Sequence, residues 1–137
     1  TTDKALDDAN AKNEDGSDRK DPITGEQIVI YGLKTLAKNQ CKITANEFIA
    51  RFNWLVERSI YDSSKAIPDV VKTYVAAIKT DCAEIETAID NASNMTAFKA
   101  LYENEYNYDS NGLVESIKTI NRINRWSDDY DVQNYIR

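Results

Sequence analysis

The stretch PDVVKTYVAAIKTDCAEIETAI, residues 68–89, decides the fold class that the sequence predicts. Its apolar residues are spaced alternately by four and three positions, and they are Val71, Val75, Ile78, Cys82, Ile85 and Ile89. This spacing is typical of a helix that packs nearly parallel or antiparallel to its neighbours, at about 20°. Pro68 suits the first turn of such a helix, because the N–H that proline lacks would have no helical acceptor there. The stretch therefore predicts a long helix in a bundle.

Two helices are predicted before this stretch. Apolar residues at helical spacing indicate a first helix near residues 24–39, and they are Ile30, Leu33 and Ala37. Thr44, followed three positions later by Glu47, forms a capping box, in which each side chain accepts a hydrogen bond from a backbone N–H at a helix start. We therefore expect a second helix to begin at Thr44 and to end near Tyr61. Its apolar face carries Phe48, Phe52, Leu55 and Val56.

Further helices are predicted after the long one. A turn at residues 91–94, with the sequence NASN, precedes a short helix that contains Met95, Phe98, Leu101 and Tyr102. Another helix is indicated by the helical spacing of Leu113, Ile117 and Ile120. Ser127 is placed to cap a last short helix that reaches Ile136.

These patterns together predict an all-α fold, a helical bundle of four to five main helices over residues 23–126. The chain has 137 residues, which suits one domain, and its 4 glycines and 2 prolines are too few to connect many short strands. Residues 1–22 contain one large apolar side chain, Leu6, so we expect a flexible acidic N-terminal arm. Residues 127–137 are expected to form a C-terminal helix or docking tail.

The charge and hydropathy of the chain limit the classes of partner. The formal net charge of -6 disfavours nucleic acid, whose affinity for proteins comes mainly from lysine and arginine contacts to phosphate. The same charge allows an alternative function, an acidic mimic that occupies a nucleic-acid site on another protein. No apolar run approaches the roughly 20 residues of a membrane span. The sequence indicates no cellular compartment, and Cys41 and Cys82 are interpreted as free thiols, with a disulfide left open.

The sequence gives no support for an enzyme. The chain contains no histidine, the commonest general base and metal ligand. The common nucleophile and phosphate-binding motifs, such as G-x-S-x-G and G-x-x-x-x-G-K, do not occur. No pair of carboxylates is singled out by its spacing. We therefore expect a non-enzymatic protein without a resident cofactor.

One face of the second predicted helix is rich in aromatic and arginine side chains. The face consists of Arg51, Trp54, Arg58 and Tyr61, which recur at three or four residues. Tryptophan, tyrosine and arginine are the residues most enriched in binding hot spots. We predict that these four residues bind a partner protein. The alternative is that Glu47 pairs with Arg51, that Arg58 lies over Trp54, and that the face packs under the N-terminal arm or the C-terminal tail.

The stretch NYDSNGLVESIK, residues 107–118, resembles an EF-hand calcium loop through its middle. Oxygen ligands stand at its first, third and fifth positions, with Gly112 at the sixth. The resemblance implies a calcium site formed by Asn107, Asp109, Asn111 and Glu115. Both ends depart from the pattern, because Asn107 is neutral and Lys118 replaces the bidentate glutamate. The alternative is that Asp109, Ser110 and Asn111 act as capping and turn residues.

The sequence therefore predicts a non-enzymatic interaction or assembly protein. The classes considered are a virion component, an adaptor, an immunity-type inhibitor and a host-directed factor. The partner is expected to be another protein, including other copies of the chain in an assembly. Two alternatives are kept, a calcium-binding helical module that uses residues 107–118 and the acidic nucleic-acid mimic.

Overall fold

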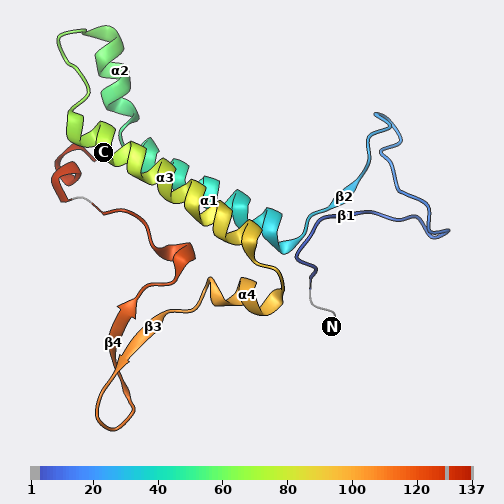
Figure 1. The fold of residues 1–137 in the computed structure, drawn as a ribbon. Coiled ribbons are helices and arrows are strands. Elements are labelled where there is room, and N and C mark those ends of the chain that lie inside the picture. The colour runs from blue at the N-terminus through green and yellow to red at the C-terminus, as the bar shows by residue number, and fades with distance from the viewer. Residues whose placement is uncertain (1–3, 129, 137) are drawn as a thin grey trace.

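The computed structural model describes residues 4–128 and 130–136. At its centre, two long helices lie side by side and antiparallel, α1 (Leu33–Ala50) and α3 (Asp69–Asn91) (Figure 1). The helix α2 (Asn53–Tyr61) continues beyond the end of α1, and the short α4 (Met95–Ala100) follows α3. The strands pair as β1 (Ala9–Asn10) with β2 (Val29–Ile30) and as β3 (Glu105–Tyr108) with β4 (Val114–Thr119). Two 3₁₀ helices complete the described chain, η1 (Arg122–Asn124) and η2 (Tyr130–Tyr135).

The fold is mixed α/β, so the predicted all-α bundle is wrong. The main error lies at residues 113–126, which form β4 and η1 instead of a fifth long helix. A second error lies at residues 24–32, which contain β2 and precede the start of α1. In both places the apolar spacing matched a helix, but the chain pairs with another strand.

The long helix predicted from residues 68–89 is confirmed. Pro68 directly precedes α3, and the residues predicted to face the core include Val71, Ile78, Ile85 and Ile89, all of which are buried. They contribute to two apolar clusters along the α1–α3 contact. The first surrounds Ile78 and is completed by Leu55 of α2 and Val132 of η2. The second surrounds Ile85 and Ile89.

The helix start predicted at Thr44 is wrong. Thr44 and Glu47 lie inside α1, which runs without interruption to Ala50. Cys41 and Ala45 are buried four residues apart on the side of α1 that faces the core, so packing favours a continuous helix through Thr44. The chain bends instead at residues 51–52, between α1 and α2.

The start of α1 is capped by the N-terminal segment. The backbone N–H groups of Leu33 and Lys34 donate to the carbonyl oxygens of Ala5 and Leu6, at 2.8 and 3.0 Å. These bonds satisfy donors that the first turn of a helix otherwise leaves without partners. The approach is so close that a Cβ on Gly32 would lie 2.3 Å from the carbonyl oxygen of Leu6.

The described part of the predicted flexible arm is paired with the segment that follows it. β1 aligns Ala9 with Ile30 and Asn10 with Val29, and isolated bridges join Lys12 to Asp18 and Lys20 to Gln27. The resulting β1–β2 arm is mostly exposed and stands away from the helices in Figure 1.

The β3–β4 hairpin replaces the predicted fifth helix. Its loop closes with a hydrogen bond from the backbone N–H of Asp109 to the carbonyl oxygen of Leu113, at 2.9 Å. Gly112 has a φ of 79°, which glycine adopts without the steric penalty of a Cβ. Asn111 does not have a positive φ, so this is a longer loop and not the two-residue turn that Asn-Gly commonly forms, and Gly112 supplies its one left-handed residue.

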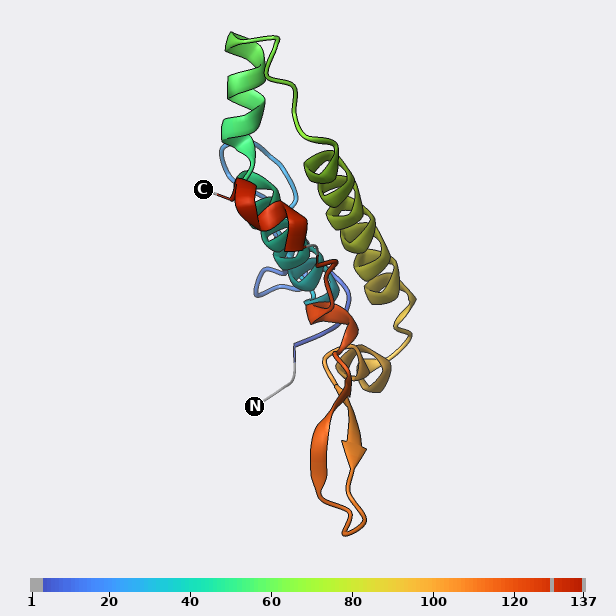
Figure 2. The same cartoon turned by 90° about the vertical axis from the view of Figure 1, so that its left-hand side faces the viewer.

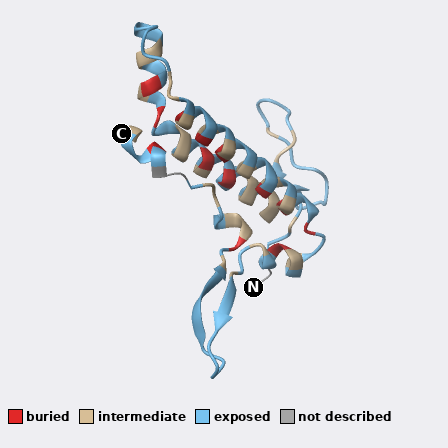
Figure 3. Ribbon diagram, turned by 60° about the vertical axis from the view of Figure 1, so that its left-hand side comes forward, coloured by how far each residue is buried: buried red, intermediate tan, exposed pale blue. Residues whose placement is uncertain are grey.

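The molecule is extended, and much of it is exposed. In two views related by a quarter turn, α2 and the β3–β4 hairpin lie at opposite ends (Figures 1 and 2). Buried residues are concentrated on the helices, whereas the hairpin is exposed along its length (Figure 3). The accessible surface is 9783 Å². A compact monomer of 15.5 kDa would expose roughly 7,200 Å².

None of the helices in residues 4–128 and 130–136 has the combination of length and apolar character that crossing a bilayer requires.

Candidate protein-binding surfaces

The predicted binding residue Trp54 contacts the chain's own C-terminal segment. Its indole Nε1–H donates to the carbonyl oxygen of Tyr135, at 2.7 Å. The Arg58 guanidinium lies over the Trp54 ring, 5.2 Å from its centroid. This arrangement agrees with the alternative interpretation for Trp54 and Arg58. The Glu47–Arg51 pair of that interpretation is not among the salt bridges of the described residues. Trp54 therefore holds the tail in this structure, and Arg58 covers the Trp54 ring.

The other two residues of the predicted face lie apart from the tail contact. Arg51 directly follows α1, and its guanidinium lies 5.4 Å from the centroid of the Phe48 ring. Tyr61 is the last residue of α2 and is 90% exposed. Partner binding by Arg51, Trp54, Arg58 and Tyr61 stays a prediction, and Arg51 and Tyr61 are the exposed members.

The predicted calcium loop forms the end of the β3–β4 hairpin, so strands and not helices flank it directly. The helix expected before it is present as α4 but ends at Ala100, and the helix expected after it is replaced by β4. The Asp109 Oδ1 atom accepts hydrogen bonds from the backbone N–H groups of Asn111 and Leu113, at 2.8 and 3.0 Å. Asn107 Nδ2 donates to Ser116 Oγ across the strands, at 3.1 Å. The Asp109 contacts are turn contacts, as in the alternative interpretation, but the turn leads into β4 and not into the helix that this interpretation expected.

The four predicted calcium ligands are distributed over both strands and the turn. Asn107 lies in β3, Asp109 and Asn111 lie in the turn, and Glu115 lies in β4. Among the residues that the structure describes, no group of three or more acidic, cysteine or histidine side chains is arranged to hold a metal ion. Calcium binding stays a prediction that the structure does not test.

One face of the hairpin is apolar. Tyr106 is paired with Ile117, and Tyr108 is paired with Val114. Directly paired residues of an antiparallel ladder share a face, so these four side chains lie on the same side. They are between 39% and 59% exposed, and neither strand makes an extensive contact with a helix in the described chain. We call this surface the hairpin face.

The opposite side of the hairpin is polar. It carries Asn107 and Ser116, which are paired and hydrogen-bonded to each other. A two-stranded hairpin is at best marginally stable in water on its own and normally packs its apolar side against another element. We therefore expect the hairpin face to pack against another apolar surface.

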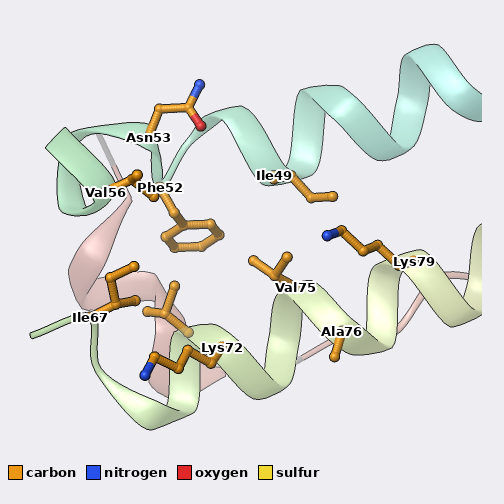
Figure 4. A pocket seen from close by; sticks show the side chains of 10 residues that line it. Ile49, Phe52, Asn53, Val56, Ile67, Lys72, Val75, Ala76 and Lys79 are labelled. Atoms are coloured by element: carbon orange, nitrogen blue, oxygen red, sulfur yellow. The ribbon is translucent and has the colours of Figure 1, made fainter. Parts of the chain in front are cut away.

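A second apolar surface is a groove between the α1–α2 corner and α3. Its volume is about 390 Å³. Figure 4 shows the Phe52 ring between the helices, with Ile49 on α1 and Val75 on α3 at its sides. Val56 of α2 and Ile67 extend the apolar lining. We call this surface the α1–α3 groove.

The charged side chains of the α1–α3 groove are both cationic. Lys72 and Lys79 extend from α3 along its edge, and no carboxylate lines it (Figure 4). Within the described residues, neither lysine takes part in a salt bridge. An adjoining hollow of about 380 Å³ shares Ile49 and Lys79 and continues the groove along the two helices.

The two cysteines meet between α1 and α3. Both are free thiols, and their Sγ atoms are 3.3 Å apart. Burial raises the pKa of the Cys41 thiol to about 12, and its hydrogen bond to Cys82 acts in the same direction. Cys41 is therefore protonated in the folded chain at neutral pH.

Comparisons with known proteins found no family model, no curated protein and no solved structure that matches this chain.

Sequence reasoning missed the hairpin face and the α1–α3 groove. The hairpin had a local signal, the Asn111-Gly112 turn between segments that contain tyrosine, valine and isoleucine. The α1–α3 groove had no local sequence signal, because it depends on the bend at Phe52 and on how α2 lies relative to α3. Its residues are contributed by three elements that only the folded chain brings together.

Proposed function

We propose that this chain is a non-enzymatic assembly protein that binds other protein molecules through the hairpin face and the α1–α3 groove. The observation that carries the proposal is the accessible surface of 9783 Å², which is roughly 2,600 Å² more than a compact monomer of this mass would expose. A standard protein–protein interface covers roughly 800 Å² on each partner. The excess is large enough for more than one such contact.

The character of the exposed surface supports a protein partner. The hairpin face presents two tyrosines and two β-branched side chains, and Leu113 beside the turn is 64% exposed. Aromatic residues are enriched at the buried centres of protein interfaces. The proposal that the chain is not an enzyme rests on the sequence, which contains no histidine and none of the common nucleophile motifs.

Photo-cross-linking tests this function in the native source. A photoreactive phenylalanine analogue in place of Tyr108 puts the probe on the hairpin face, and the same analogue in place of the exposed Ala100 of α4 is the control. We expect the Tyr108 probe to form a discrete cross-linked product with a protein. The proposal is wrong if the Tyr108 probe gives no more product than the Ala100 probe.

A further inference from the structure

We propose that the hairpin face of one copy docks in the α1–α3 groove of a second copy, so that the chains assemble head to tail. This inference deepens the proposed function and rests on it. It identifies the partner as a second copy of the chain, and it pairs the hairpin face of one copy with the α1–α3 groove of the other.

The segment that contains the hairpin and the lining of the α1–α3 groove have opposite net charges. Residues 103–119, which contain the hairpin, carry the four carboxylates of Glu103, Glu105, Asp109 and Glu115 against the single cation of Lys118, a net charge of −3. The groove lining carries Lys72 and Lys79 and no carboxylate, and the hollow that continues it adds Lys42 and Glu86, so the lining as a whole is net positive. Opposite charges at the rim orient an apolar contact and disfavour the wrong partner.

The charges also argue against a symmetric contact. Two hairpins placed face to face would bring two copies of the same net negative segment together, and two grooves would bring lysines toward lysines. Like charges across an interface cost free energy. A contact between hairpin and groove avoids both repulsions.

The positions of the two surfaces require a second copy. The hairpin lies at one end of the molecule, whereas the groove lies beside α2 at the other end (Figures 1 and 2). A chain therefore cannot place its own hairpin in its own groove without unfolding the segments between them. Contacts between two different surfaces are heterologous, and they generate a closed ring or an open chain of copies.

The available area is sufficient for this assembly. Each copy inside a head-to-tail chain uses two surfaces, its hairpin and its groove. At roughly 800 Å² for each surface, the two contacts would cover roughly 1,600 Å² per copy. The excess accessible surface of the whole chain, to which the β1–β2 arm and α2 also contribute, is roughly 2,600 Å².

Complementary variants of the full chain test the proposal. Ile117→Glu places a charge on the hairpin face, and the double variant Lys72→Glu with Lys79→Glu reverses the charge of the groove. All three residues are exposed, so the helical core stays intact, and circular dichroism checks this. Ser116→Glu on the polar side of the hairpin and Lys99→Glu on α4 are the matched controls.

Light scattering after size-exclusion chromatography measures the mass over a concentration series. We expect the wild-type chain and both control variants to exceed 15.5 kDa as concentration rises, and each of the two disrupting variants to stay at 15.5 kDa. An equimolar mixture of the disrupting variants should give a species of twice that mass. One intact hairpin and one intact groove remain in that pair, so growth stops at two chains.

Three results would overturn the head-to-tail contact. They are a wild-type chain that is monomeric at every concentration, a disrupting variant that still assembles alone, and a mixture that stays monomeric. If the wild-type chain is monomeric while the Tyr108 probe captures a different protein in the native source, the self-assembly is wrong and the proposed function stands. If that probe also captures nothing, both are wrong.

Discussion

Replacing Ile78 with alanine tests the core that holds α1, α2 and η2 together. Ile78 is 0% exposed and lies in the cluster that includes Leu55 of α2 and Val132 of η2. The substitution removes three carbon atoms, and the lost burial alone is worth about 2.4 kcal/mol at about 0.8 kcal/mol for each carbon. The cavity that remains between three elements raises the cost to about 3–4 kcal/mol, within the range measured for such truncations.

The matched control is Ile60→Ala on α2. Ile60 is 74% exposed, so its truncation removes little buried surface and should change stability by less than about 0.5 kcal/mol. Alanine also favours the helix more than isoleucine does. The comparison therefore separates burial from helix propensity.

Urea unfolding followed by circular dichroism measures both variants. We expect the transition of Ile78→Ala to move to a clearly lower urea concentration and that of Ile60→Ala to stay near wild type. Equal shifts for the two variants would refute the reasoning, because they would mean that Ile78 is no better buried than Ile60.

Three further predictions concern the cysteine pair, the C-terminal segment and the turn. The pKa of the Cys41 thiol is about 12 in the folded chain and about 8.5 in the unfolded chain, so its contribution to stability is full below about pH 8.5 and is lost as the pH rises toward 12. The difference in unfolding free energy between wild type and Cys41→Ala should therefore change by roughly 2 kcal/mol between about pH 8 and pH 10, and urea unfolding measures it. Trp54→Phe removes the hydrogen bond to Tyr135 and should cost about 1 kcal/mol while amide exchange in residues 130–136 becomes faster, and unchanged exchange would contradict the contact. Calorimetry with calcium up to about 1 mM tests the calcium site predicted from Asn107, Asp109, Asn111 and Glu115: that prediction requires saturable heat that a chelator abolishes, and a flat titration would reject it.

The long helix was predictable from sequence because its signal is both long and strictly periodic. Apolar residues repeat from Val71 to Ile89 over 19 residues, and no alternative element fits that spacing. The turn before α4 was predictable for a local reason, since the Asn94 side chain accepts from the backbone N–H of Ala97, at 2.8 Å.

The end of α1 and the β3–β4 hairpin were not predicted, because two patterns competed in each place. Thr44 and Glu47 form a good capping box, but they are equally acceptable inside a helix whose neighbours Cys41 and Ala45 pack on α3. Leu113 and Ile117 are spaced as in a helix, yet the Asn111-Gly112 turn lets the same residues pair with β3. Short apolar runs do not separate these alternatives without the fold.

The candidate site was only partly predictable for the same reason. The Trp54 side chain was found from its type and spacing, but its contact with Tyr135 joins residues 81 positions apart in sequence. The α1–α3 groove depends on the angle between helices, which no local pattern encodes. The hairpin face depends on the strand register, and irregularities between Glu105 and Tyr106 and between Asn107 and Tyr108 shift that register.

Small-angle X-ray scattering of the full chain, extrapolated to zero concentration, tests the central claim that a large apolar surface stands away from the helical core. A compact domain of 137 residues has a radius of gyration of about 14 Å. The extended arrangement of α2, the β1–β2 arm and the hairpin predicts a value clearly above this. A value of about 14 Å would contradict the account, because the hairpin would then lie folded against its own helices and its apolar face would not be available to a partner.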